Sequence, residues 1–127
     1  MGKAVMISVN PPYSRWLVEY IKKIEWRKEI LPSGRTFVYE TKKKGGCGKV
    51  IGEIAVGSSY YLDVNRISGN LISDGMVSRE LLQKYSKGTL LAANFIDFAV
   101  EYENPEDLSK FGLKRPPQSW QYVEELK

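Results

Sequence analysis

The sequence predicts an α+β fold in which helices flank a mostly antiparallel, partly closed β-sheet. Several short runs rich in β-branched and aromatic residues lie between turn-forming residues, which is typical of strands. Apolar residues recur at helical spacing in one longer segment and two shorter ones. A length of 127 residues without a visible repeat or linker fits one domain, residues 1–127.

The first strand is expected over Ala4–Val9, a short, mostly apolar run. Asn10 is expected to cap the helix that follows the two prolines. After this helix, Glu25–Ile30 alternates charged and other residues with a period of two, which predicts a strand with one charged face. The apolar stripe predicted for the helix consists of Trp16, Leu17, Tyr20, Ile21 and Ile24.

A hairpin is predicted after the turn at residues 31–34. Its strands are Thr36–Thr41 and Val50–Val56, and the basic turn Lys42–Lys49 joins them. The residues Tyr60–Val64 either prolong the second strand or begin a loop. Ile67–Val77 contains two glycines, an asparagine and an aspartate, which favours a loop or broken helical turn at one end of the sheet.

The last part of the chain begins with a helix capped by Ser78, with Glu80 in its first turn. A long strand is expected over Leu90–Tyr102, and a strand of this length usually bends. A short helix is expected to open around 104–107, before the closing strand Ser119–Glu124.

The composition limits the chemistry that the protein can perform. Hydrophobic residues make up 43% and charged residues 27%, as in a soluble globular protein, and no apolar run could cross a bilayer. There is no histidine, so the most common general base and metal ligand is absent. Cys47 is the single cysteine, which excludes an internal disulfide and a zinc-binding cysteine cluster. A cytoplasmic protein without signal peptide, membrane, metal or cofactor is expected.

The net charge of +4 favours polyanionic partners modestly. The run KKKGGCGK is not a phosphate-binding loop, because Lys43 replaces its first glycine and Val50 replaces its magnesium-binding Ser or Thr. It is interpreted as a flexible basic hairpin, with contact to nucleic-acid phosphates as the alternative. Cys47 is then a loop thiol, since no histidine can activate it.

The stretch YIKKIEWR places Lys22, Glu25 and Arg27 close together beside apolar neighbours. Half-buried charges are costly unless they are paired, so either these groups satisfy one another or a ligand does. In the structural alternative, Glu25 and Arg27 form an ion pair that fixes the helix to the sheet. In the functional alternative, Asp74 from the polar loop completes a cluster in which Lys22 has a lowered pKa.

The aromatic residues are expected mainly in the core and at its rim rather than in a base-stacking platform. Trp120 is the exception, because it follows two prolines that make its approach rigid. It could close a barrel or form a wall for a flat ligand, and Gln118 and Ser119 could supply hydrogen bonds to that ligand.

These residues resemble the ASCH domain family, a branch of the PUA-like fold with a Gly-x-Lys-x-x-Glu-x-Arg motif after its first helix. Lys22, Glu25 and Arg27 match this motif, and Tyr20 stands in place of its glycine. The resemblance extends to YETKKKGGCGKVIGE, SDGMVSRELLQKYSKG and LKRPPQSWQYVEE, and so to nearly the whole chain. It implies a small bent β-barrel flanked by helices, with a cleft beside the motif.

The resemblance also implies a function linked to RNA binding, RNA cleavage or deacetylation of 4-acetylcytidine. In the amidohydrolase branch the catalytic trio is Lys, Thr and Glu. Lys22 matches the lysine and Asp74 the acid, but Glu25 stands where the threonine nucleophile would be. The leading hypothesis is therefore an RNA- or nucleotide-binding cleft, and the alternative is a hydrolase using Lys22, Glu25 and Asp74. The expected ligand-binding residues are Tyr20, Lys22, Glu25, Arg27, Gln118, Ser119 and Trp120.

Overall fold

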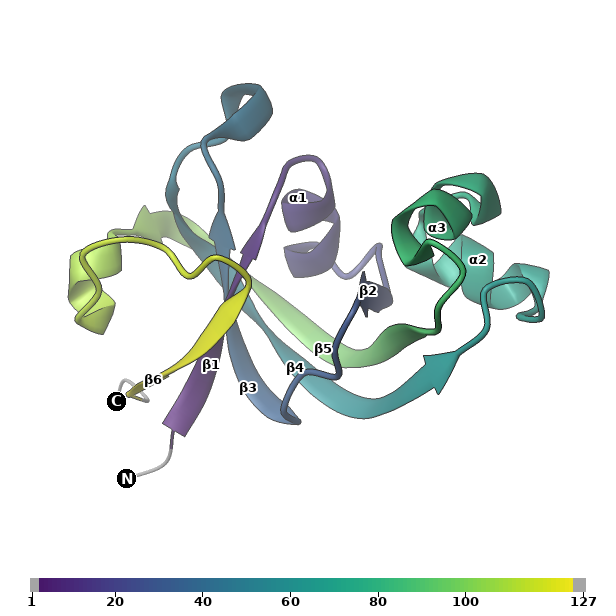
Figure 1. Ribbon diagram of the computed structural model, residues 1–127. Helices are drawn as coiled ribbons and strands as arrows, with labels where there is room; N and C mark the ends of the chain where they lie inside the picture. Colours follow the sequence, from purple (N-terminus) through teal and green to yellow (C-terminus); the bar gives the residue numbers. More distant parts are fainter. Residues whose placement is uncertain (1–2, 125–127) are drawn as a thin grey trace.

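Residues 3–124 are described by the computed structural model, in which one six-stranded sheet is flanked by short helices (Figure 1). The strands are β1 (Lys3–Val9), β2 (Ile24–Arg27), β3 (Gly34–Glu40), β4 (Lys49–Leu62), β5 (Leu91–Glu106) and β6 (Trp120–Glu124). The helices are α1 (Tyr13–Val18), α2 (Gly69–Gly75) and α3 (Arg79–Ser86), with 3-10 turns at Lys43–Gly45 and Leu108–Phe111.

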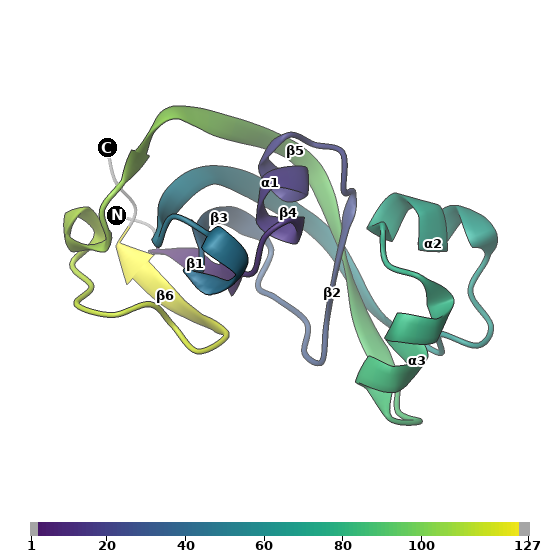
Figure 2. The same ribbon diagram turned by 90° about the horizontal axis from the view of Figure 1, so that it is seen from above.

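The sheet is open but strongly curved. Its strand order is β2-β5-β4-β3-β1-β6, with β1 and β3 parallel and the other neighbours antiparallel. The register of β4 against β5 shifts at three places, and such bulges bend and twist long strands. The sheet therefore curls around α1 (Figure 2). The predicted α+β class and the partly closed, mostly antiparallel sheet are confirmed.

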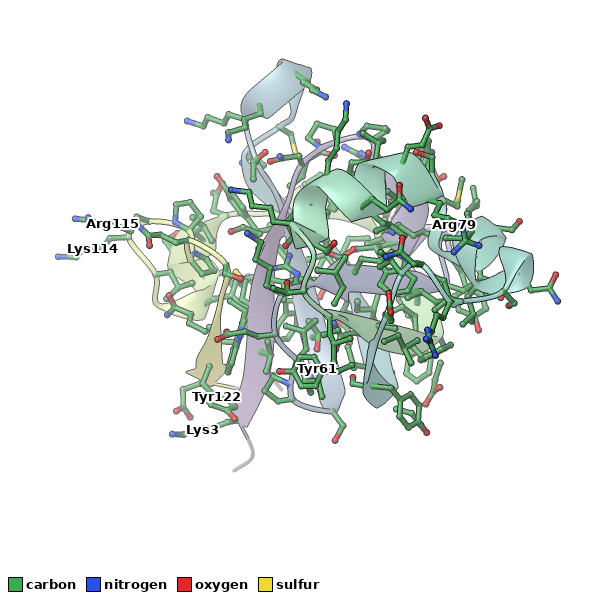
Figure 3. The ribbon with its side chains drawn as sticks, turned by 45° about the vertical axis from the view of Figure 1, so that its right-hand side comes forward. Lys3, Tyr61, Arg79, Lys114, Arg115 and Tyr122 are labelled. Carbon is green, nitrogen blue, oxygen red and sulfur yellow. The ribbon has the colours of Figure 1, made fainter. Side chains whose placement is uncertain are left out.

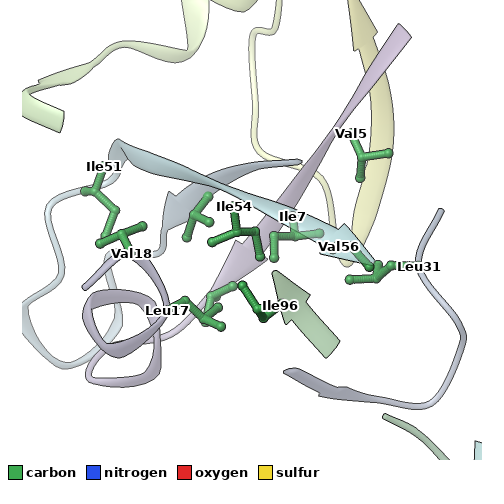
Figure 4. Close-up of a cluster of buried hydrophobic side chains, with 11 residues drawn as sticks. Val5, Ile7, Leu17, Val18, Leu31, Ile51, Ile54, Val56 and Ile96 are labelled. Carbon is green, nitrogen blue, oxygen red and sulfur yellow. The ribbon is translucent and has the colours of Figure 1, made fainter. Parts of the chain in front are cut away.

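The largest core cluster lies between α1 and the concave face of the sheet (Figure 4). Leu17 and Val18 of α1 pack there against Ile7, Ile54 and Ile96 from three strands. Alternate residues of β1 enter a second cluster on the opposite face, where Phe37 contacts Phe111. Burial on both faces explains why Ala4–Ile7 are apolar without alternation.

A third cluster joins β2 to the α2–α3 unit, which lies to one side of the sheet (Figure 1). Ile24 and Trp26 pack there with Leu82 and Leu91. The predicted cap at Ser78 is confirmed, since its hydroxyl accepts a hydrogen bond from the amide of Leu81. The segment predicted as a loop or broken helical turn, Ile67–Val77, instead contains the regular helix α2, capped by Ser68.

The first helix is shorter than its sequence pattern predicts. Pro12 is the N-cap residue, and the Asn10 side chain accepts a hydrogen bond from Thr41 instead of capping the helix. Tyr20 has a positive φ of 59°, which ends the helical path. Beyond Leu17 the predicted stripe is therefore no longer helical: Tyr20 packs against the core from outside α1, Ile21 is exposed, and Ile24 is buried in β2.

The other strand predictions hold with changed ends. Tyr60–Leu62 prolong β4, and β2 is shorter than Glu25–Ile30 and pairs with β5. β5 runs on to Glu106, so the last short helix starts only at Leu108. Among the described residues, no helix has the length and hydropathy needed to span a membrane.

Candidate functional site

The connection between α1 and β2 positions the charged residues. Tyr20 adopts the left-handed conformation, which glycine reaches without steric cost. This explains why a glycine suits that position of the motif that the sequence resembles. The Tyr20 hydroxyl donates to the Ile96 carbonyl at 3.3 Å, and the Lys23 amide donates to the Asp74 carbonyl at 2.7 Å. These bonds fix the entry to β2 against both the sheet and α2.

Lys22 is buried, with 2% of its surface exposed. Its ammonium group donates a hydrogen bond to the Gly75 carbonyl at the end of α2 and lies 4.0 Å from the Glu25 carboxylate. It also lies 5.6 Å from the centre of the Tyr13 ring, in a cation–π arrangement. Burial lowers the pKa of Lys22, because the charged form loses its hydration; the attraction of Glu25 opposes this effect.

Arg27 lies two residues after Glu25 on the same face of β2, as the alternation in the sequence predicts. Its Nε donates to the Glu25 carboxylate at 3.1 Å. Its Nη2 donates to the Ser8 carbonyl at 2.8 Å, and its Nη1 donates to the carbonyl and hydroxyl oxygens of Ser119 at 3.2 and 2.9 Å. The ion pair between Glu25 and Arg27, which the structural alternative expected, is therefore present.

Asn94, fully buried in β5, holds the backbone of this region in place. Its amide nitrogen donates to the Glu25 carbonyl at 3.0 Å. Its oxygen accepts hydrogen bonds from the Leu31 amide at 2.9 Å and the Ser59 hydroxyl at 2.7 Å. This buried amide thus joins β2 and the segment that follows it to the bulged part of β4.

A cleft of about 1110 Å³ opens over Lys22, Glu25 and Arg27. Its walls come from four parts of the chain: the end of β1 with the start of α1, the basic hairpin, α3, and the segment before β6. Besides the three charged residues, its lining includes Ser8, Asn10, Tyr13, Lys28, Tyr39, Thr41, Lys42, Lys43, Leu81, Leu82, Tyr85, Pro116, Pro117, Gln118 and Ser119.

A smaller cleft of about 310 Å³ adjoins it. Trp120 and Glu29 line only this smaller cleft, whereas Arg27, Lys28, Tyr85 and Ser119 line both clefts. The two clefts are therefore neighbours that meet at Arg27 and Ser119.

The structure brings together most of the predicted site residues, but not all of them. Lys22, Glu25, Arg27, Gln118 and Ser119 line the main cleft. Of the remaining three, Tyr20 contacts the sheet and Trp120 lines the smaller cleft, so neither lines the main one.

Asp74 requires a correction. Its side chain is exposed and does not line either cleft, so the predicted cluster with Lys22 does not form. The C-terminal end of α2 contributes backbone carbonyls instead: the Asp74 carbonyl accepts a hydrogen bond from the Lys23 amide, and the Gly75 carbonyl accepts one from the Lys22 ammonium group. The segment does lie beside Lys22, but the Asp74 carboxylate is exposed outside the cleft.

Several lining residues were not singled out from the sequence as site residues. Tyr13, Tyr39 and Tyr85 face the cleft from three different elements, and their sequence positions alone resemble those of core residues. Lys42 and Lys43 did carry a signal, the basic hairpin, whose contact with phosphates was an open alternative. In residues 3–124 no group of three or more Cys, Asp or Glu side chains is placed to hold a metal ion.

Comparison with solved structures identifies the fold. The chain is similar to ASCH from Zymomonas mobilis, with a TM-score of 0.82 and 23% identity over 96% of this chain and 88% of that one. Two variants of that protein match nearly as well. The serine-to-alanine variant has a TM-score of 0.80 and 22% identity, covering 96% and 89% of the two chains. The tyrosine-to-phenylalanine variant has a TM-score of 0.80 and 24% identity, covering 96% and 91%.

The chain has the ASCH fold. The fold expected from the resemblance of YIKKIEWR and the later segments is thereby confirmed over nearly the whole chain. No family model matches the sequence, and neither does any curated protein. In this example of the ASCH fold, the motif residues Lys22, Glu25 and Arg27 lie on the floor of the cleft.

Proposed function

We propose that this protein binds RNA, or a nucleotide-like ligand, in the main cleft. The observation that carries the proposal is the combination of fixed charged groups on the cleft floor with aromatic and basic residues around them. A volume of about 1110 Å³ accommodates at least one nucleotide-sized ligand. Glu25 and Arg27 come from β2 and are held by hydrogen bonds, so they can fix the orientation of a ligand.

The floor offers both kinds of hydrogen-bonding partner to a base or a ribose. The Glu25 carboxylate accepts hydrogen bonds, while Lys22 donates them. Gln118, which lines the same cleft, has both a donor and an acceptor. A base edge presents donors and acceptors together, so this mixed set suits nucleobase recognition.

The rim supplies positive charge for phosphates. Lys42 and Lys43 from the basic hairpin and Lys28 after β2 all line the main cleft and are exposed. The described lining residues of the main cleft include five Lys and Arg side chains but only one carboxylate, that of Glu25. Phosphate contacts of this kind supply affinity that falls steeply with salt.

Fluorescence anisotropy with labelled single-stranded RNA tests the proposal. The double variant Lys42→Ala/Lys43→Ala should weaken binding and lower the slope of log K against log[salt] by about one to two. The double variant Arg66→Ala/Lys84→Ala removes the same charge at exposed positions outside both clefts and should change little. Equal losses of RNA affinity in both double variants would show that net charge alone causes the effect. This result would contradict binding in the main cleft. Equally tight binding of single-stranded DNA with the same sequence would contradict a preference for RNA.

A second candidate function, hydrolysis of a modified nucleoside or of RNA, is favoured by one observation. Lys22 is buried with a lowered pKa, 4.0 Å from Glu25. Such a lysine can act as a general base, with Glu25 positioning a water molecule. Asp74 does not share this role, because its side chain is exposed and lies outside the main cleft.

Turnover assays distinguish the two functions. A panel of acylated nucleosides, 4-acetylcytidine among them, and small RNAs is incubated with the protein. Hydrolysis requires that Lys22→Ala abolishes turnover while Lys42→Ala/Lys43→Ala retains it. A protein that binds these compounds without converting any of them is a binding protein and not a hydrolase.

A further inference from the structure

The smaller cleft beside the main one is not used by the proposed function. Its volume of about 310 Å³ is at the lower end of the range for ligand sites. Aromatic side chains reach it from two elements, Tyr85 from α3 and Trp120 from β6. The two clefts share Arg27 and Ser119, so a ligand that leaves the main cleft at this junction enters the smaller one.

Trp120 is held in place rather than free to rotate. Its ring packs edge-on against the exposed Tyr122 of β6 (Figure 3), with the ring centres 5.3 Å apart and the planes at 86°. It also borders the largest core cluster, while it is still partly exposed. A fixed, partly exposed indole is a suitable stacking surface for a flat group, because little side-chain entropy is lost on binding.

Positive charge where the two clefts meet favours a ligand in which an anionic group links two flat groups. Arg27 already donates hydrogen bonds to Glu25, Ser8 and Ser119. Lys28 lines both clefts, is exposed, and has its ammonium group 5.1 Å from the centre of the Tyr85 ring. Its flexible chain can reach a phosphate that passes from one cleft to the other.

We propose that the smaller cleft binds a second nucleotide unit, whose base stacks on Trp120 while its phosphate contacts Lys28. The ligand is then an oligonucleotide of at least two units rather than a single nucleoside or nucleotide. This inference rests on nucleotide binding in the main cleft and extends it. It also gives Trp120 a role that its position outside the main cleft would otherwise leave open.

The test compares ligands of different length. Nucleoside monophosphates, dinucleotides and trinucleotides of ribose are titrated by calorimetry against the wild-type protein and Trp120→Leu. Dinucleotides should bind the wild type more tightly than mononucleotides. Trp120→Leu should reduce dinucleotide affinity about 5- to 150-fold, the range that stacking of one base on an aromatic side chain gives. Its mononucleotide affinity should stay within about twofold, because Trp120 does not line the main cleft.

A surface variant covers the case in which Trp120→Leu disturbs the fold. Glu29 lines only the smaller cleft and is exposed, so Glu29→Lys replaces a repulsive charge without disturbing the core. It should tighten dinucleotide binding severalfold and leave mononucleotides unaffected. Glu19→Lys, which makes the same charge change at an exposed position outside both clefts, is the matched control and should have no such selective effect.

Fluorescence gives a second readout that does not depend on affinity. Dinucleotides should quench the wild-type emission more than mononucleotides do, and this difference should vanish in Trp120→Leu. Equal affinities for mononucleotides and dinucleotides, or equal losses of both in Trp120→Leu, would overturn the second subsite and leave the main cleft intact. If no nucleotide of any length binds, both this inference and the proposed function fail.

Discussion

Arg27 of β2 donates two hydrogen bonds to Ser119, at 3.2 Å to its carbonyl and 2.9 Å to its hydroxyl oxygen. Arg27 belongs to one edge strand of the sheet, and Ser119 directly precedes the other edge strand, β6. Because β2 and β6 are not paired, a side chain rather than a backbone ladder connects these edges. The same guanidinium therefore closes the curved sheet and forms part of the cleft floor.

Replacing Arg27 should destabilise the fold. Arg27→Lys keeps the charge but cannot reproduce the planar set of donors to Glu25, Ser8 and Ser119, so we expect a loss of about 1–3 kcal/mol in the free energy of unfolding. Urea denaturation measures this loss. Arg66→Ala, at a side chain that is 87% exposed, is the control and should change the free energy by less than about 0.5 kcal/mol. Equal stability of the two variants would mean that Arg27 does not connect the edges.

The contact between Gly75 and Trp26 gives a second prediction. A Cβ atom at Gly75 would lie 2.2 Å from the Trp26 indole nitrogen, which is closer than any real contact. Gly75→Ala should therefore shift α2 away from Lys22 and cost about 1–3 kcal/mol. Gly69→Ala in the same helix has no neighbour within 4 Å and should be neutral or slightly stabilising. Thermal unfolding of the two variants checks this, and an equally stable Gly75→Ala would contradict the packing.

Lys22 should leave a signature in the pH dependence of stability. Its folded pKa lies below 10.5, its ordinary value, because burial disfavours the charge. Between the two pKa values the unfolded chain binds more protons, so this residue makes the free energy of unfolding rise with pH and level off above the unfolded pKa. Urea unfolding of wild type and Lys22→Met from neutral to alkaline pH should show a rising difference. Parallel curves would contradict a lowered pKa.

Glu40 should stabilise the fold in the opposite pH range. Burial alone would raise its pKa, but hydrogen bonds from Ser14 at 2.7 Å, the Cys47 amide at 2.9 Å and Arg15 at 3.1 Å lower it below 4.5. The stabilisation is complete above the unfolded pKa and is lost as the pH falls through the folded pKa.

Glu40→Gln tests this assignment. At pH 7 it should lower the free energy of unfolding by about 1–3 kcal/mol, and the difference from wild type should shrink in acid. Glu103→Gln, at an exposed position, should show neither effect. A Glu40→Gln deficit that stays constant down to pH 3 would show that its cause is packing and not the charge.

The sequence predicted the fold well because each strand carries its own local signal. The run Ala4–Val9 and the hairpin around Lys42–Lys49 follow directly from hydrophobic pattern and turn residues. The end of α1 could not be predicted in this way. A left-handed Tyr20 has no local signal, since the surrounding contacts hold a conformation that its side chain disfavours.

The candidate site was predicted where its residues are close in sequence. Lys22, Glu25 and Arg27 lie within six positions, so the alternation of β2 was enough to place two of them on one face. Asp74 was misplaced because the direction of a side chain on α2 depends on tertiary packing. Tyr85 was missed as a site residue for the same reason, since only the packing of α3 against β2 turns it toward the cleft.

The central claim is that a nucleotide binds over Lys22. Titration of ¹⁵N-labelled protein with short single-stranded RNA, followed by two-dimensional NMR, tests it most directly. The largest chemical shift changes should fall on Lys22, Glu25, Arg27 and residues 118–119, and Lys22→Met should abolish them. Binding over Lys22 would be contradicted if RNA binds while the resonances of these residues do not shift. It would also be contradicted if RNA does not bind at all.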